Sequence, residues 1–134
     1  MSDKKIFVDS NIFLNLFGTN PEKKEFAKSL AKQSHTISTQ VVNENVNVCL
    51  RKLKLSKAEA FAHGHYLMNN FLLVSITQTT IESAYVISTK YGFSLWDSLI
   101  IASAIENNCH TLYTEDMQNG QIIDKKITIL NPFL

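Results

Sequence analysis

Four carboxylates lie at positions where a parallel α/β sheet would bring them together. Asp9 follows a short apolar run at residues 6–8, and Asp116 follows a second run at residues 111–114. Asp97 lies in the first turn of a strongly apolar helical segment, and Glu44 lies early in another helical segment. Because ligand sites of such folds lie beyond the carboxyl ends of the strands, these positions predict a shared acidic cleft.

An acidic cleft of this kind favours one type of chemistry. Neighbouring carboxylates repel one another and raise each other's pKa, so the site needs compensating positive charge. Mg²⁺ and Mn²⁺ prefer carboxylate oxygen and water as ligands. Two such ions about 3.5–4 Å apart activate a water and stabilise the leaving oxygen of a phosphodiester. This mechanism requires several short acids and no nucleophilic side chain, which the sequence satisfies.

Each acid also has a purely structural interpretation. Asp9 could cap a helix, and Asp97 could complement a helix dipole, an interaction worth roughly 0.3–1 kcal/mol. Glu115 and Asp116 could be turn residues. Taken singly, each structural interpretation is the stronger one. Taken jointly, three of the five Asp residues fall at strand ends or helix starts, and this favours a site.

The elements that would position these acids alternate along the chain. Apolar runs predict strands at residues 6–8, 35–38, 71–76, 111–114 and 127–130. Helical periodicity and end signals predict helices at residues 21–33, 39–50, 56–69, 79–91 and 95–107, with Thr39 as a cap and Gly92 as a C-terminal signal. Strands alternating with helices predict a single α/β domain over residues 1–134, with a central parallel sheet and helices on both faces.

Composition limits the remaining possibilities. The chain has 134 residues, 45% of them hydrophobic, and 13 Lys and Arg against 12 Asp and Glu. A net charge of +1 excludes a bulk polycation, but without the four candidate acids eight acidic residues face 13 basic ones. Cys49 and Cys109 have no spacing typical of structural zinc and are expected to be buried thiols. The N-terminal apolar run is too short for a signal peptide or a membrane span, so we expect a cytoplasmic protein.

Four stretches of the sequence resemble the PIN domain family of small α/β nucleases, and most closely the VapC-type ribonuclease toxins of toxin–antitoxin pairs. They are FVDSNI at residues 7–12, STQVVNE at 38–44, LWDSLIIA at 95–102 and LYTEDM at 112–117. Each stretch alone is weakly specific, but the four occur in the family's order and extend over nearly the whole chain.

The resemblance implies a Mg²⁺ or Mn²⁺ site and water attack on RNA phosphodiester bonds. In the family's pattern this site is lined by Asp9, Glu44, Asp97 and Asp116. Asn11 corresponds to a residue that helps to hold the first Asp, and Thr114 to a small hydroxyl residue near the site. Glu115 lies at a variable position, and we expect its side chain either to face solvent or to lie just outside the residues that bind the metal. The resemblance also implies a cognate antitoxin and a homodimer as partners.

Some side chains near these stretches have open roles. Arg51, Lys52 and Lys54 form a basic cluster that is either a solvated face or a grip on the RNA backbone. Trp96, next to Asp97, is either a packing residue or a base-stacking platform. Besides the toxin, the alternatives are a PIN nuclease in RNA processing, a non-catalytic domain that binds RNA or a protein partner, and a phosphoaspartyl signalling protein. The last would need an acidic pair after the first strand, where Asp9 stands alone.

Overall fold

A computed structural model describes residues 5–134 of the chain. Its strands are β1 (Ile6–Val8), β2 (Thr36–Ser38), β3 (Leu72–Val74), β4 (Thr111–Tyr113), β5 (Ile122–Ile123) and β6 (Ile127–Leu130). Its α-helices are α1 (Ser10–Leu14), α2 (Pro21–Ser29), α3 (Thr39–Arg51), α4 (Lys57–Asn70), α5 (Gln78–Tyr91) and α6 (Leu95–Glu106). Two single 3₁₀ turns, Asn15–Phe17 and Leu30–Lys32, follow α1 and α2.

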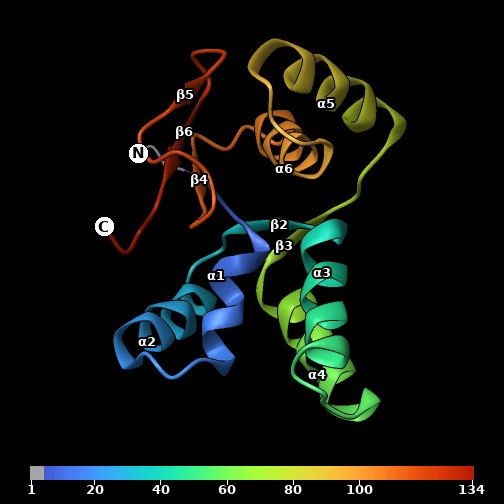
Figure 1. The fold of residues 1–134 in the computed structure, drawn as a ribbon, viewed down its shortest axis with the longest axis vertical. Helices are drawn as coiled ribbons and strands as arrows, with labels where there is room; N and C mark the ends of the chain where they lie inside the picture. The colour runs from blue at the N-terminus through green and yellow to red at the C-terminus, as the bar shows by residue number, and fades with distance from the viewer. Residues whose placement is uncertain (1–4) are drawn as a thin grey trace.

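The strands form one sheet in the order β3-β2-β1-β4-β6-β5. All neighbouring pairs are parallel except β5 with β6. Figure 1 shows α5 and α6 on one side of the strands and α1 to α4 grouped on the other. The structure thus confirms an α/β fold with a mostly parallel central sheet and helices on both faces.

A row of buried side chains crosses the centre of the sheet and sets its register. Phe7 lies opposite Leu112, which lies opposite Ile129, and all three are fully buried. A shift of one residue would turn these side chains to the other face, so the register is strongly specified. Since Val8 lies opposite Tyr113, the next residues of the two strands, Asp9 and Thr114, are neighbours at the carboxyl edge.

Helix ends account for most of the differences from the sequence prediction. Thr39 is not the cap of α3: the Ser38 side chain accepts from the Val41 N–H at 3.4 Å, because β2 ends at Ser38 in an extended conformation. The predicted capping box of α4, Ser56 with Glu59, is present, and Gly92 ends α5 with φ +81°. The helix expected at residues 21–33 tightens into a 3₁₀ turn after Ser29.

The antiparallel edge strand β5 was not predicted. It pairs with β6 across a tight turn in which Asp124 and Lys125 have φ +52° and +57°. A turn of this type is usually signalled by Asn-Gly or Asp-Gly, and Asp-Lys gives no such signal.

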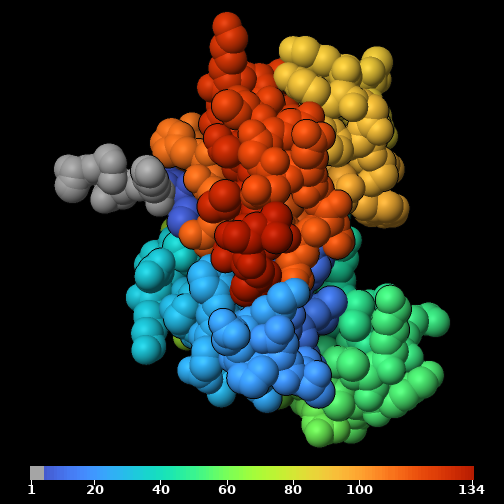
Figure 2. Space-filling view, turned by 60° about the vertical axis from the view of Figure 1, so that its left-hand side comes forward, coloured from blue at the N-terminus to red at the C-terminus, as the bar shows by residue number. Residues whose placement is uncertain are grey.

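The C-terminal residues pack on the N-terminal half of the chain. Figure 2 shows them against the first helices, where the Phe133 ring lies 5.3 Å from that of Phe26, centroid to centroid.

Cys49 and Cys109 are both free and buried, as expected. Within residues 5–134, no helix combines the length and the apolar character that a membrane span requires.

Candidate acidic site

Asp9 is the most buried of the four acids, with 5% of its surface exposed. It directly follows β1, and two donors hold its carboxylate. Oδ1 accepts from the Ser10 N–H at 2.7 Å, and Oδ2 accepts from the Thr114 hydroxyl at 2.9 Å. Both donors come from residues at the carboxyl edge of the sheet, so the fold itself orients the carboxylate.

Thr114 connects Asp9 to the loop that follows β4. Its Oγ1 accepts from Asn11 Nδ2 at 3.1 Å and from the Asp116 N–H at 3.2 Å. Asn11 Oδ1 in turn accepts from the Glu115 N–H at 3.1 Å. Asn11 therefore acts on Asp9 through Thr114, and the same two residues position the backbone that carries Asp116.

Glu44 reaches the same edge from α3. Its Oε1 accepts from the Ser10 hydroxyl at 2.8 Å, and its Oε2 accepts from Gln40 Nε2 at 3.1 Å. Gln40 Nε2 also donates to the Trp96 carbonyl at 3.2 Å, which joins α3 to the start of α6. Sequence analysis missed Ser10 and Gln40. The signals for them were the position of Ser10 beside Asp9 and the i, i+4 spacing of Gln40 and Glu44.

Asp97 lies in the first turn of α6, where its backbone N–H donates to the Ser94 cap at 3.1 Å. Burial, and then the charges of Asp116 and Glu44, raise the pKa of Asp97. Burial raises the pKa of Asp9 to about 6, with further contributions from the charges of Glu44 and Asp97, against the lowering effect of the two hydrogen bonds. Asp97 is thus within electrostatic range of the other three acids, and Asp9 is within range of Glu44 and Asp97.

The donor chemistry of this cluster fits a hard divalent cation, since all four side chains offer carboxylate oxygen. Their mutual repulsion is the feature that a bound cation would relieve. Among residues 5–134, no group of three or more His, Cys, Asp or Glu side chains is positioned to hold a metal ion.

The remaining predicted residues lie around the cluster. Glu115 does not face solvent freely: its carboxylate pairs with Lys23 Nζ at 3.0 Å. Arg51 is the last residue of α3, Lys52 caps that helix, and Lys54 follows with φ +57°; all three are exposed. The basic cluster therefore lies at the far end of α3 from Ser38, on the helix that carries Glu44.

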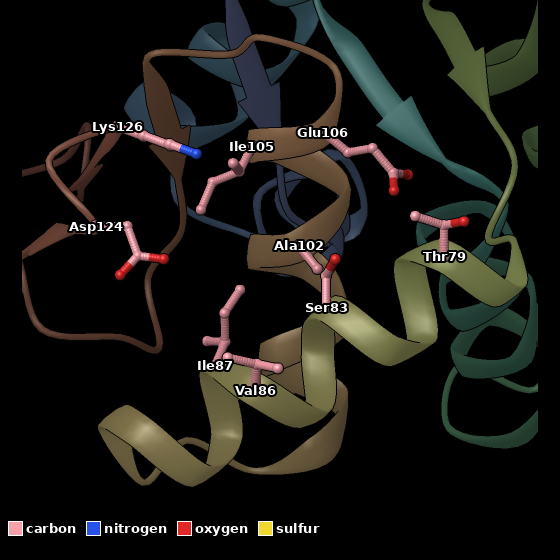
Figure 3. A pocket seen from close by; sticks show the side chains of 9 residues that line it. All are labelled: Thr79, Ser83, Val86, Ile87, Ala102, Ile105, Glu106, Asp124 and Lys126. Carbon is pink, nitrogen blue, oxygen red and sulfur yellow. The ribbon is translucent and has the colours of Figure 1, made fainter.

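A separate pocket of about 400 Å³ lies between α5, α6 and the β5–β6 turn. Figure 3 shows Val86, Ile87 and Ile105 at this pocket, together with Glu106 and Asp124. Both carboxylates have partners outside it. Glu106 accepts from the Thr80 hydroxyl at 2.6 Å, and Asp124 accepts from Lys90 Nζ at 2.9 Å and the Tyr91 hydroxyl at 2.7 Å. The acidic edge of the sheet is therefore the stronger candidate for chemistry.

These features define a class of protein: a small α/β domain with an acidic site at the carboxyl edge of its parallel strands. The chain belongs to the PIN domain family, whose sequence model matches residues 6–120. No curated protein sequence matches the chain.

Several solved structures share the fold. A toxin–antitoxin complex from Klebsiella pneumoniae has a TM-score of 0.70 and 19% identity, covering 96% of this chain and 98% of that one. The Mycobacterium tuberculosis toxin VapC20, described as cleaving the sarcin–ricin loop, has a TM-score of 0.68 and 18% identity, covering 84% and 90%. VapBC2 from Rickettsia felis, bound to a promoter DNA fragment, has a TM-score of 0.69 and 16% identity, covering 92% and 96%.

Proposed function

We propose that this PIN domain is a Mg²⁺- or Mn²⁺-dependent endoribonuclease and the toxin of a toxin–antitoxin pair. The observation that carries the proposal is the convergence of Asp9, Glu44, Asp97 and Asp116, with the pKa values of Asp9 and Asp97 raised by burial and by neighbouring acids. Four carboxylates at one edge cost stability unless a cation compensates them, and phosphodiester hydrolysis makes use of such an arrangement.

In this mechanism each residue has a defined task. Asp9, Glu44, Asp97 and Asp116 would hold the cation through their oxygens. Ser10 and Thr114 hold the Asp9 carboxylate in one orientation, at 2.7 and 2.9 Å, while Gln40 and Ser10 do the same for Glu44. When bound, a divalent cation supplies the charge that favours deprotonation of water and stabilises the leaving oxygen of the phosphodiester.

Asn11 and Thr114 are positioning residues in this proposal. Asn11 Nδ2 and Thr114 Oγ1, 3.1 Å apart, tie α1 to the loop after β4. Loss of this link would leave the Thr114 hydroxyl, which donates to Asp9 and accepts from the Asp116 N–H, less firmly held. Arg51, Lys52 and Lys54 are proposed to contact RNA phosphates, which local positive charge favours even where the net charge is small.

The direct test is cleavage of a structured RNA by the purified protein. We expect cleavage with Mg²⁺ or Mn²⁺, none with excess chelator, and a loss of at least a hundredfold in Asp97→Asn. Asp124→Asn is the matched control, because it makes the same chemical change at the β5–β6 turn, outside the site. If Asp97→Asn cleaves as fast as Asp124→Asn, the assigned site is wrong. Metal titration by calorimetry, with no binding by the parent protein, would instead favour a non-catalytic RNA- or partner-binding domain.

The toxin role, rather than RNA processing, is supported by the fold's similarity to structures solved as toxin–antitoxin complexes. We expect expression alone to arrest growth and co-expression with a neighbouring small open reading frame to relieve the arrest. The neighbour's product would be the antitoxin, and the Asp97→Asn variant should not arrest growth. Indifference to expression with active cleavage in vitro would favour a role in RNA processing.

A further inference from the structure

A second pocket adjoins the acidic site on the side of α3 and α6. It has a volume of about 390 Å³, and its lining includes Gln40, Asn43, Glu44, Asn47, Ile76 and Trp96. Glu44 belongs both to this pocket and to the acidic cluster. A group bound here would therefore lie next to a phosphodiester placed at a cation that the four carboxylates would hold.

The indole of Trp96 is the most accessible aromatic surface at this pocket. Trp96 is 62% exposed. The backbone next to it is held in place, because the Asp97 N–H donates to the Ser94 side chain. The Trp96 carbonyl accepts from Gln40 Nε2, which also donates to Glu44 Oε2. The backbone of Trp96 is thus tied to the acidic site while its ring remains free. Stacking of an unpaired base on such an aromatic ring typically strengthens binding roughly ten- to a hundredfold.

Amide side chains provide the polar part of the pocket. Asn43 and Asn47 lie one helical turn apart on the exposed face of α3. None of the side-chain hydrogen bonds within residues 5–134 uses the Asn43 amide, and Asn47 uses only its Oδ1, which accepts from Arg51 Nε at 3.2 Å. Gln40 Oε1 is buried and has no donor within the same residues. Amides carry donor and acceptor side by side, which matches the edge of a nucleobase.

Arg51 places a positive charge further along the same face of α3. Glu44, Asn47 and Arg51 are separated by three and four residues, so they follow one stripe of α3. At a rise of 1.5 Å per residue, Arg51 lies about 10 Å beyond Glu44 along the helix axis. The stripe therefore runs from the acidic site, past the pocket, to a guanidinium suited to phosphate.

We propose that this pocket binds an unpaired nucleobase that flanks the scissile phosphate of a single-stranded RNA segment. Trp96 stacks on the base, Asn43 and Asn47 hydrogen-bond to its edge, and Arg51 contacts the adjoining phosphate. A base inside a duplex is stacked between its neighbours and does not expose a face to the indole. This inference deepens the proposed nuclease function and rests on it for the position of the scissile phosphate.

The test uses Trp96 as its own probe, because the chain has one Trp. The single-stranded hexamers rA6, rC6 and rU6, and a G·C-rich RNA duplex of 12 base pairs, are titrated in Mg²⁺, and fluorescence is read by stopped flow before product accumulates. We expect saturable quenching by at least one single-stranded hexamer and little or none by the duplex. Equal quenching by the duplex would overturn the requirement for an unpaired base.

Variants are compared by the anisotropy of the 5′-labelled hexamer. Trp96→Leu should weaken binding roughly ten- to a hundredfold, while Trp96→Phe should stay within about fivefold of the parent, because it keeps a stacking ring. Asn43→Ala and Asn47→Ala should each weaken binding about three- to tenfold. Tyr85→Leu is the matched control: it removes a 58% exposed ring from α5, outside the pocket, and should bind like the parent. Far-UV circular dichroism checks that each variant is folded.

The outcomes separate this inference from the proposed function. RNA cleavage with unchanged Trp96 fluorescence, or Trp96→Leu binding as tightly as Tyr85→Leu, overturns the base pocket and leaves the nuclease intact. Quenching with the expected variant order but no cleavage supports the pocket and overturns the nuclease. If Trp96→Leu keeps RNA binding but loses association with the product of the neighbouring open reading frame, the pocket is a protein contact and the inference is wrong.

Discussion

Replacing Asp9 by Asn should stabilise the metal-free protein at neutral pH. Burial, with the charges of Glu44 and Asp97, raises the pKa of Asp9 from 3.8 to about 6. A rise of about two pKa units corresponds to about 3 kcal/mol of destabilisation once the group is ionised in both states. Because the folded-state pKa is raised, the penalty is absent below about pH 4 and complete above about pH 7.

The expected size of the effect follows from the contacts of the carboxylate. Asn keeps one acceptor oxygen, so one of the two donors, the Ser10 N–H or the Thr114 hydroxyl, loses its partner. A lost hydrogen bond of this kind costs about 1 kcal/mol. We therefore expect Asp9→Asn to be about 2 kcal/mol more stable than the parent at pH 7.5. At pH 4 we expect little difference, because the parent carboxyl is then protonated and, like Asn, offers one carbonyl acceptor.

The assay is urea unfolding followed by far-UV circular dichroism in chelator, at pH 4 and pH 7.5. Glu25→Gln is the control, since it removes one negative charge from an exposed pair with Lys28 at 3.4 Å. Exposed pairs contribute little, so its difference from the parent should stay below about 1 kcal/mol at both pH values. The free energy of unfolding of Asp9→Asn could differ from that of the parent by the same amount at both pH values. This result would refute the reasoning, because it would mean that the Asp9 carboxylate is exposed to solvent.

Four further outcomes are expected. Thr114→Val should lower the free energy of unfolding by about 1–3 kcal/mol and raise the pKa of Asp9, seen by NMR titration, because the buried hydroxyl serves Asp9, Asn11 and the Asp116 N–H. Gly92→Ala should cost about 1–2 kcal/mol in urea unfolding, because φ is +81° there, whereas Gly18→Ala, at φ −88°, should not incur this conformational penalty. Lys52→Ala and Lys54→Ala should each reduce the slope of log affinity for single-stranded RNA against log salt by about 0.7. Light scattering should give twice the chain mass of 15.2 kDa if the expected homodimer forms, and a monomer mass would contradict that expectation.

The sequence allowed the parallel strands and most helix ends to be predicted, because their signals are local. Residues 6–8 and 127–130 coincide with β1 and β6, and the capping box at Ser56 and Glu59 is present. The neighbours of each strand were not predictable in this way. β1 pairs with β4 more than 100 residues away, and only the completed core selects that partner.

The candidate site likewise combines features with local sequence signals and contacts between distant residues. The four acids were predicted as a group because each follows a strand or lies early in a helix. Their hydrogen-bond partners depend on side-chain directions across the sheet edge. The Ser10 hydroxyl meets Glu44 across 34 residues, and Thr114 meets Asp9 across 105. No period or spacing in the sequence indicates pairs this far apart, so the contacts of Ser10 with Glu44 and of Thr114 with Asp9 were found only in the structure.

The position of Asp9 links stability to the proposed metal chemistry. Two hydrogen bonds orient its carboxylate but do not offset burial, which is why its pKa stays near 6. A cation held by the four acids would favour their ionised forms and bind only the folded state. At 100 times its dissociation constant, such a ligand stabilises a protein by about 2.7 kcal/mol, close to the penalty assigned to Asp9. Mn²⁺ should therefore raise the stability of the parent at pH 7.5 by about this amount and that of Asp9→Asn by much less. An equal gain in stability in both proteins would show that Asp9 does not contribute to metal binding.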